Sequence, residues 1–329
     1  MKQLKRCGIL LLALLCVLPL LSACNNENED EETVYYTVLF DSNGGSPVEK
    51  QIVASDTTVR EPTPPTREGY VFEGWRSEKG TFWNFAAQYV TSDMTLTAVW
   101  VDPARIFEHK PMPEGGTKIT AVKQTYATLA VPDTIAGYSV VAIGDGVFAD
   151  LSSHEVQTIT LPHTLTSVGE NAFKDCTDIS ITIDPRAALT EIGESAFYGC
   201  NRLSAVRFGE GLTEIAPWAF DGCTALREIR LPKSVVSVSD SAFANCTSLV
   251  SVMFYPELAE IGNAAFDDCD ALTALYFYGT AAQMITLKST VASQNDKLLD
   301  ATPYYYSATD PNVKDQYWFL NENGAPQLW

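Results

Sequence analysis

The chain has 329 residues, with 41 Asp and Glu against 22 Lys and Arg and a formal net charge of −19. A length of this order suggests about two domains. The excess of acid argues against nucleic acid as a partner and against docking to anionic lipid headgroups, because both depend on clustered Lys and Arg.

Residues 1–23 are typical of a secretory signal peptide. A basic start is followed by an uncharged apolar run of 14 residues over 8–21, which is short of the roughly 20 residues of a membrane-spanning helix. Leu21-Ser22-Ala23 before Cys24 resembles the bacterial lipoprotein box. The resemblance implies cleavage before Cys24 and a lipid anchor on this residue. An ordinary signal peptide with a chance cysteine is the alternative.

Residues 24–34 form an acidic segment that would not fold alone, because residues 25–33 contain no apolar side chain. We interpret the segment as a solvated tether. The acidic run directly after Cys24 also resembles the surface-export signal of Bacteroidetes lipoproteins, and this is a second interpretation of the same residues.

Residues 35–101 alternate between strand-like runs and turns. The Asn43-Gly44 pair follows an apolar run and predicts a hairpin. Asp41 and Asn43 suggest a cation site at first sight, but turn chemistry explains them better. The tryptophans at 75, 83 and 100 are expected in the core, and an exposed one could serve as a ligand platform.

Several spaced groups in this segment resemble the Listeria–Bacteroides repeat of the internalin B type. The resemblance covers nearly the whole of 35–101 and implies a small β-grasp-like module used as a spacer or contact module. The groups are Phe40-Asp41 with Asn43-Gly44-Gly45, Gly69-Tyr70 with Gly74-Trp75, Trp83-Asn84-Phe85, and Thr95-Leu96 with Ala98 and Trp100. Residues 102–117, with three prolines and a glycine pair, are predicted to be a linker.

The segment 118–280 contains a repeat of about 23 residues. A Phe recurs at spacings of 25, 24, 23, 23 and 23, and in every copy but the first a Cys follows three residues later. Stacked units bury apolar faces that a single unit cannot, so these residues are expected in a structural core. They are Phe148, Phe173, Phe197, Phe220, Phe243 and Phe266, with Cys176, Cys200, Cys223, Cys246 and Cys269.

The sequence allows three interpretations of the five cysteines: disulfides, metal ligands or reduced thiols. Disulfides between neighbouring coils are geometrically conceivable, and a metal site would need ligands that converge rather than form a ladder. Buried reduced thiols that pack as small hydrophobic groups are the favoured interpretation, and no metal site is predicted. The unit at 179–184 carries one extra residue, which predicts a bulge or a widened turn there.

These units resemble the BspA-like, or Treponema pallidum type, leucine-rich repeat, and residues 189–200 illustrate the match. The resemblance covers about 120–329 and implies a leucine-rich-repeat solenoid on a surface or secreted protein, often one implicated in adhesion. We therefore predict a mainly β chain with short turns and helical loops, in which a small β-grasp-like domain precedes the solenoid. Residues 281–329 are predicted to be a C-terminal cap in which Tyr304–Tyr306 and Trp318 cover the last coil.

No catalytic constellation is recognisable in the sequence. The three histidines are His109, His154 and His163, and there is no glycine-rich phosphate loop, nucleophile elbow or His-rich metal motif. We expect a protein that is not an enzyme and needs no cofactor.

The remaining candidates are the outward side chains of the strands. The expected outward row is Thr160, Arg207, Arg230, Met253 and Tyr276, with Tyr255 and Tyr278 beside its far end and Arg202 and Arg227 nearby. Arg and Tyr are common at interfaces; the alternative is a solvated sheet face of incidental composition. We expect a cell-surface binding or adhesion module for a host or bacterial protein or glycan, anchored in the outer membrane or on the cell surface. The second hypothesis is a structural or scaffold component of an envelope complex, such as a glycan-import accessory.

Overall fold

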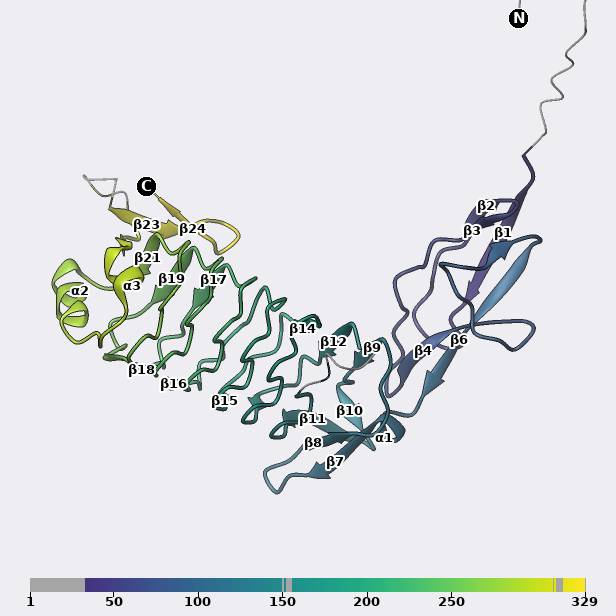
Figure 1. Ribbon diagram of the computed structural model, residues 1–329, viewed down its shortest axis with the longest axis horizontal. Coiled ribbons are helices and arrows are strands. Elements are labelled where there is room, and N and C mark those ends of the chain that lie inside the picture. Colours follow the sequence, from purple (N-terminus) through teal and green to yellow (C-terminus); the bar gives the residue numbers. More distant parts are fainter. Residues whose placement is uncertain (1–32, 150, 152–155, 310, 312–315, 329) are drawn as a thin grey trace, which may run out of the picture.

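The computed structural model describes residues 33–149, 151, 156–309, 311 and 316–328. Figure 1 shows a small β module at one end and a solenoid of stacked coils that ends in two short helices and a hairpin. The predicted signal peptide, Cys24, most of the tether, His154 and Trp329 lie outside the described residues. No helix in the described ranges has both the length and the apolar character needed to cross a membrane.

The first module is a four-stranded sheet in the order β2-β1-β6-β4, with a parallel central pair and antiparallel outer pairs. Val38, Trp75 and Leu96 point to its inner face and are fully or almost fully buried. Val90 of the short β3–β5 pair and Val59, which follows β3, cover this face. The strands are β1 (Tyr35–Asp41), β2 (Gln51–Ala54), β3 (Thr57–Thr58), β4 (Val71–Ser77), β5 (Tyr89–Val90) and β6 (Met94–Val101).

The predicted Asn-Gly turn is present, but it is not the tip of a tight hairpin. Asn43 and Gly44 have φ angles of 47° and 85°, the left-handed values that this residue pair favours. The β1–β2 pairing begins only at Val38 and Gln51. The turn therefore closes one end of a longer loop.

The prediction of a linker at 102–117 is wrong for most of this segment. Asp102 caps helix α1 (Pro103–Ile106) through its side chain, and Pro103 occupies the first turn, where its missing N–H costs nothing. Strand β7 (Phe107–Pro111) then pairs with β8 (Thr117–Val122). Ile106 and Phe107 are fully buried in the same apolar cluster as the first coils, together with Val71 of the first module. The segment forms the N-terminal end of the solenoid.

The solenoid coils contribute short strands to two series of parallel sheets, although the coil at 203–208 adds only an isolated bridge to the second series. One series contains β8, β11, β13 and β15 and then β16, β18 and β20. The other series, called the outer sheets below, contains β9, β12 and β14 as the first outer sheet and β17, β19, β21 and β22 (Thr302–Tyr306) as the second. The mainly β solenoid that the sequence predicts is thereby confirmed. The strands are β9 (Thr128–Ala130), β10 (Thr134–Ile135), β11 (Tyr138–Ile143), β12 (Thr158–Leu161), β13 (Ser167–Val168), β14 (Ser180–Ile183), β15 (Glu191–Ile192), β16 (Glu214–Ile215), β17 (Glu228–Arg230), β18 (Ser237–Val238), β19 (Ser251–Phe254), β20 (Glu260–Ile261) and β21 (Ala274–Phe277).

The recurring Phe side chains form one continuous stack along the solenoid axis. Consecutive ring centroids lie 4.9–5.4 Å apart and the ring planes differ by 1–20°. Phe107 closes the N-terminal end of the stack with an edge contact to Phe148 at 6.3 Å. Because the five Phe from Phe148 to Phe243 also donate their backbone N–H to the next coil at 2.8–2.9 Å, ring stacking and main-chain bonding share one spacing.

A left-handed residue precedes each Phe by two positions. The φ angle there lies between 52° and 62° in all six copies, although only the first is a glycine. Trp218 and Ala264 are among them, and such residues adopt this conformation at a cost. The repeated stacking bonds around the turn hold it in place.

The C-terminal end of the stack is closed by Asn295, which is 1% exposed. Its Oδ1 accepts the backbone N–H of Phe266 at 3.0 Å, the bond that a further coil would otherwise supply. Its Nδ2 donates to the carbonyl oxygens of Gly262, Ala292 and Ser293 at 2.8–3.1 Å. One side chain thus satisfies the buried N–H of Phe266 and three partly buried carbonyl groups.

Helices and a last group of strands complete the cap. Thr280 and Gln283 form a capping box at the start of α2, whose Met284 and Leu287 are buried. Strand β22 extends the outer sheet in register with β21. The elements are α2 (Ala281–Lys288), α3 (Asp296–Asp300), β22 (Thr302–Tyr306), β23 (Tyr317–Leu320) and β24 (Pro326–Leu328).

We expect Asn295→Ala to lower the free energy of unfolding by about 2–4 kcal/mol, since a buried group left without its partner costs about 1–3 kcal/mol. Urea unfolding followed by circular dichroism measures the change. Asn323→Ala, on the exposed hairpin turn, is the matched control and should have no effect beyond about 0.5 kcal/mol. Equal stability of the two variants would contradict the capping role.

Candidate binding surface

The outward side chains of the second outer sheet are aligned as the repeat predicts. Arg230 pairs with Met253, Met253 with Tyr276, and Tyr276 with Tyr304 across the parallel strands β17, β19, β21 and β22. Alternation along each strand places their neighbours Ile229, Val252 and Leu275 in the core.

The predicted row is not continuous across the solenoid. Thr160 pairs with Thr182 in the first outer sheet, and the coil of Arg207 contributes only an isolated bridge between Leu189 and Phe208. The extra residue of the preceding coil forms no bulge in β14, which stays in register with β12. It lies in a widened turn after β14, where the Ala187 N–H bonds the Asp184 carbonyl. Arg207 therefore stands between the two outer sheets.

Thr182 is an exposed member of this face that sequence reasoning missed. The outward residues from Arg207 to Tyr276 lie seven positions after the Cys of their own coil, whereas Thr182 lies six positions after Cys176, so the same count leads to the buried Ile183. The buried Ile181 and Ile183 on either side of Thr182 were the pattern that could have identified it.

The far end of the row is covered by the C-terminal hairpin, so the prediction that Met253 faces solvent is wrong. Met253 is only 6% exposed, yet it lies outside the main core cluster. Its sheet neighbour Arg230 donates from Nη1 to the Gly324 carbonyl oxygen in the β23–β24 turn at 2.8 Å. Its other neighbour, Tyr276, makes an edge contact with Trp318 at 5.5 Å. Figure 1 shows β23 and β24 lying beside β17, β19 and β21.

The tyrosines at this end pack as part of the cover. The Tyr255 and Tyr278 rings stack at 4.1 Å, and Tyr278 also meets the edge of the fully buried Trp318 at 4.8 Å. Burial raises the pKa of Tyr276 and of Tyr278 above the ordinary value of a phenol. We assign this cluster to cap packing, and the predicted ligand role of its tyrosines stays a prediction.

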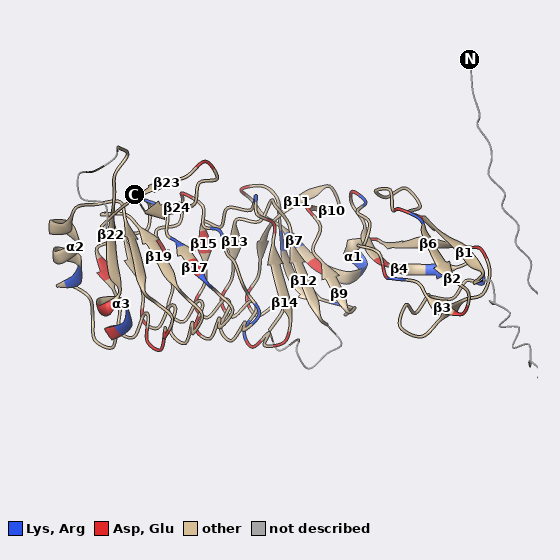
Figure 2. Ribbon diagram, turned by 90° about the horizontal axis from the view of Figure 1, so that it is seen from above, with Lys and Arg blue, Asp and Glu red and all other residues tan. Residues whose placement is uncertain are grey.

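The coils next to the uncovered part of the outer face carry several exposed arginines. Arg207 donates to the Pro185 carbonyl oxygen at 3.2 Å and Arg202 to the Asp178 carbonyl oxygen at 2.9 Å. Arg186 instead pairs with Asp184 at 2.7 Å, and its hydrogen bonds lower the pKa of that carboxyl to about 2. Across the described ranges, Arg202 and Arg207 have no ion-pair partner. Figure 2 shows such Lys and Arg segments interspersed with Asp and Glu along the solenoid.

The five repeat cysteines are reduced thiols that make one recurring contact. Each Sγ donates to the backbone carbonyl oxygen of the Phe in the preceding coil at 3.0–3.3 Å. Burial raises the pKa of four of these thiols, to about 12 for Cys269 and well above the ordinary value for Cys223; the four are Cys200, Cys223, Cys246 and Cys269. A thiol with this pKa is neither a nucleophile nor a metal ligand at neutral pH. The contact explains why Cys occupies this position.

The two described histidines are tied into local structure at separate places. Nδ1 of His109 lies 3.0 Å from the Thr117 hydroxyl, and Nδ1 of His163 lies 2.8 Å from Asp133. Within the part of the chain that the structure describes, no three His, Cys, Asp or Glu side chains converge as metal ligands would.

Two family matches agree with this architecture. Residues 141–273 and 180–299 match the BspA type leucine rich repeat region in six copies, and residues 36–99 match the Listeria–Bacteroides repeat domain. The solenoid is a BspA-type leucine-rich-repeat region, and the first module is a Listeria–Bacteroides repeat domain. Both resemblances seen in the sequence are confirmed.

The curated relatives share a limited part of this chain. A putative Gly-rich membrane protein of Evansella cellulosilytica is 36% identical over 101 residues, which cover 30% of this chain and 12% of the relative. Internalin H of Listeria monocytogenes is 34% identical over 113 residues, which cover 32% of this chain and 20% of the relative. The chain therefore matches only about a tenth to a fifth of the length of these relatives.

Two solved structures of leucine-rich-repeat proteins are similar to part of this chain. The Treponema pallidum leucine rich repeat protein has 22% identity and a TM-score of 0.43, covering 57% of this chain and 94% of that chain. A leucine rich cell surface protein of Faecalibacterium prausnitzii has 23% identity and a TM-score of 0.42, covering 68% of this chain and 59% of that chain. These likenesses do not extend to function.

The raised pKa of the thiols predicts a loss of stability in alkali. A group whose pKa is higher in the folded state stabilises the fold fully below its unfolded pKa, and this contribution is lost as pH rises. For Cys269 the window runs from about 9 to about 12, with a slope of about 1.4 kcal/mol per pH unit. Urea unfolding between pH 8 and pH 11 should therefore show a shallower decline for Cys269→Ala than for the parent. Thr273→Ala, an exposed change nearby, is the control, and identical slopes in all three proteins would refute the assignment.

Proposed function

We propose that this chain is a surface-displayed, non-catalytic binding protein whose BspA-type solenoid recognises a protein or glycan ligand. The observation that carries the proposal is the uncovered part of the outer face. There Thr182 and Arg207 are exposed, and the described residues place no carboxylate within ion-pair distance of the Arg207 guanidinium. An exposed Arg on a rigid solenoid coil is a favourable interface element, because little side-chain freedom beyond its own is lost on binding.

The composition of the coils supports a binding role over a catalytic one. The recurring Phe are stacked, and the recurring Cys donate to backbone carbonyls, so the repeat itself serves packing. Both repeat families suggest a surface protein-binding or adhesion role, and one of the relatives is an internalin. The residues that vary between coils on the outer face are then the ones that recognise the ligand.

The proposed location is the outer surface of the cell, with Cys24 as the lipidated residue and 24–34 as the tether. Two of the relatives are named as putative membrane proteins, which supports an envelope location. A module held by a tether of this kind would present its outer face to ligands outside the cell.

Arg207→Ala should weaken binding about tenfold, equivalent to about 1.4 kcal/mol, in the chain from residue 25 onward. The probe is an array of matrix proteins, mucins and bacterial surface glycans, and the best binder is then titrated in solution. The melting temperature should change little, since the side chain makes one exposed hydrogen bond, to the Pro185 carbonyl.

The matched control for this experiment is Lys233→Ala, another exposed cation of the solenoid, which pairs with Glu257. The control should keep the parent affinity. Unchanged affinity in Arg207→Ala would remove this face from the proposal, and the absence of any saturable ligand on the array would overturn the binding function itself.

Protease added to intact cells should remove the protein if it is displayed outward. Immunoblotting measures its disappearance, and a periplasmic protein in the same cells serves as the control for envelope integrity. Replacement of Cys24 by Ser should release the chain into the medium or the periplasm. A protein that resists protease until the cells are lysed would contradict outward display.

A further inference from the structure

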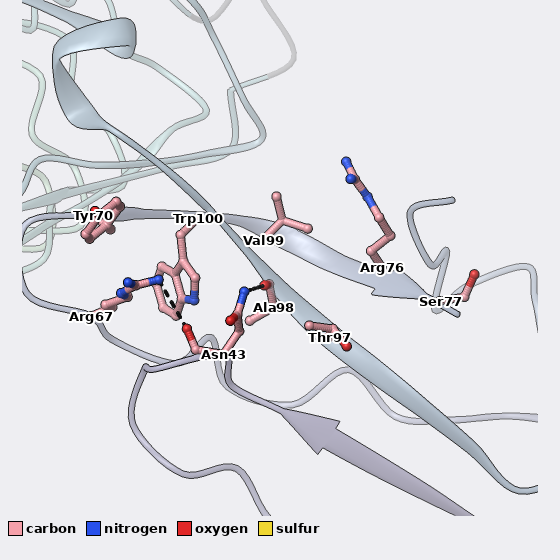
Figure 3. Close-up of a pocket in the computed structure, with 9 residues that line it drawn as sticks. All are labelled: Asn43, Arg67, Tyr70, Arg76, Ser77, Thr97, Ala98, Val99 and Trp100. Carbon is pink, nitrogen blue, oxygen red and sulfur yellow. Dashed lines mark hydrogen bonds between the residues drawn. The ribbon is translucent and has the colours of Figure 1, made fainter. Parts of the chain in front are cut away.

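The first module contains an open groove of about 390 Å³ beside strand β6, separate from the solenoid face. Figure 3 shows Val99 between Arg67 on one side and Arg76 on the other, with Tyr70 and Trp100 beside Arg67. None of the nine residues that line the groove is acidic. The chain has a net charge of −19, so a groove lined by two cations and no carboxylate differs in charge from the protein as a whole.

Arg67 is fixed in place before any ligand arrives. Its Nη1 donates to the Asn43 carbonyl oxygen at 3.1 Å, and its guanidinium carbon lies 4.2 Å from the centre of the Tyr70 ring and 6.0 Å from that of Trp100. Contacts of this kind hold the planar fork of an arginine in one orientation. One N–H is engaged with the carbonyl, and others stay available to a ligand.

The turn that supports Arg67 is itself held by β6. The Asn43 Nδ2 donates to the Ala98 carbonyl oxygen at 3.2 Å, and the Trp100 Nε1 donates to the Ser42 carbonyl oxygen at 3.0 Å. A Cβ added to Gly45 would lie 2.5 Å from the Trp100 ring, so only glycine allows this approach. The residues between 41 and 45 thus position an arginine as well as closing a loop.

Arg76 supplies the second positive charge of the groove. Its guanidinium carbon lies 4.7 Å from the centre of the Phe82 ring. Among the described residues, neither Arg67 nor Arg76 has a carboxylate within ion-pair distance. A second groove of the same module, about 580 Å³, is lined by Glu49 and Glu61 as well as Lys50 and Arg60. Its charges are balanced, which makes it an internal comparison.

The form of the groove favours a saccharide over an extended peptide. Peptides that join a sheet bind its free backbone edge, but β6 is paired on both sides, with β1 and with β4. What β6 and its neighbours offer here is side chains: the amide of Asn43, the hydroxyls of Ser77 and Thr97, and the apolar surface of Val99. Hydroxyl-rich rings match this mixture of hydrogen-bonding and apolar groups, and a carboxylate on the ring matches the bidentate fork of arginine.

We propose that this groove binds a carboxylate-bearing saccharide, with Arg67 receiving the carboxylate and Arg76 a second anionic group along the chain. The groove lies on the first module, so this proposal can be correct or wrong independently of the binding role proposed for the solenoid face.

The test is isothermal titration of the chain from residue 25 onward with an oligogalacturonate. The fully methyl-esterified oligomer, which has the same rings without the charge, is the ligand control. Oligogalacturonate should bind, the ester should bind at least about tenfold more weakly, and affinity should fall with added salt. Absence of binding, or equal binding of the ester, would overturn the proposal.

Arg76→Gln should weaken oligogalacturonate binding about tenfold or more, and no hydrogen bond of its guanidinium within the described residues ties it to the fold. Arg67→Gln should have at least as large an effect, and its melting temperature is checked because it also bonds Asn43. Arg60→Gln in the balanced groove is the matched control and should bind as the parent does. An equal loss in the control, or equal affinity of the parent for polyglutamate, would overturn the assignment.

Discussion

The structure depends on one repeated interaction, the backbone bond from the N–H of a Phe to the carbonyl of the Ala in the next coil, which the first five Phe of the repeat make. This bond is 2.8–2.9 Å long in five successive coils. It brings the rings to within 4.9–5.4 Å of one another and brings each Cys under the Phe carbonyl of the preceding coil. Hydrogen bonding requires the coils to be in register, and burial of the Phe rings supplies the apolar stabilisation. The left-handed turn before each Phe persists because both conditions act on it.

This series of backbone bonds and stacked rings has two ends, and each end is closed by a residue outside the repeat. At the first end, Phe107 of the α1–β7 segment meets the Phe stack by its edge. At the second, Asn295 replaces a backbone carbonyl with a side-chain amide. The C-terminal hairpin then covers the last strands of the outer sheet through Arg230 and Trp318. The caps therefore decide which outward residues stay available for binding.

These end effects explain which expectations from sequence held. The Phe and Cys positions could be predicted because a fixed period places chemically identical groups in identical surroundings, and the pairing of Arg230 with Met253 followed from the same count. The exposure of Met253 could not be predicted, because it depends on where a hairpin more than 60 residues later folds back. The prolines of the segment after Asp102 favour a linker, although an Asp followed by a Pro is also typical of the start of a helix. Local composition alone does not predict the structure of a segment whose conformation or exposure is decided by packing against distant residues.

The candidate sites on both modules share an electrostatic feature that the net charge conceals. Arg67, Arg207 and Arg202 each donate to a backbone carbonyl oxygen rather than to a carboxylate. A carbonyl orients the guanidinium but leaves its charge uncompensated, whereas a carboxylate would neutralise it, as Asp184 does for Arg186. The chain has nearly twice as many acidic as basic side chains, so carboxylate partners are abundant. The positive charge of the arginines that bond carbonyls is nevertheless not neutralised within the protein, and it is available to an anionic ligand. Recognition of an anionic group at such positions requires no rearrangement of the fold, because the turns and coils that present the arginines are already fixed by their own backbone bonds.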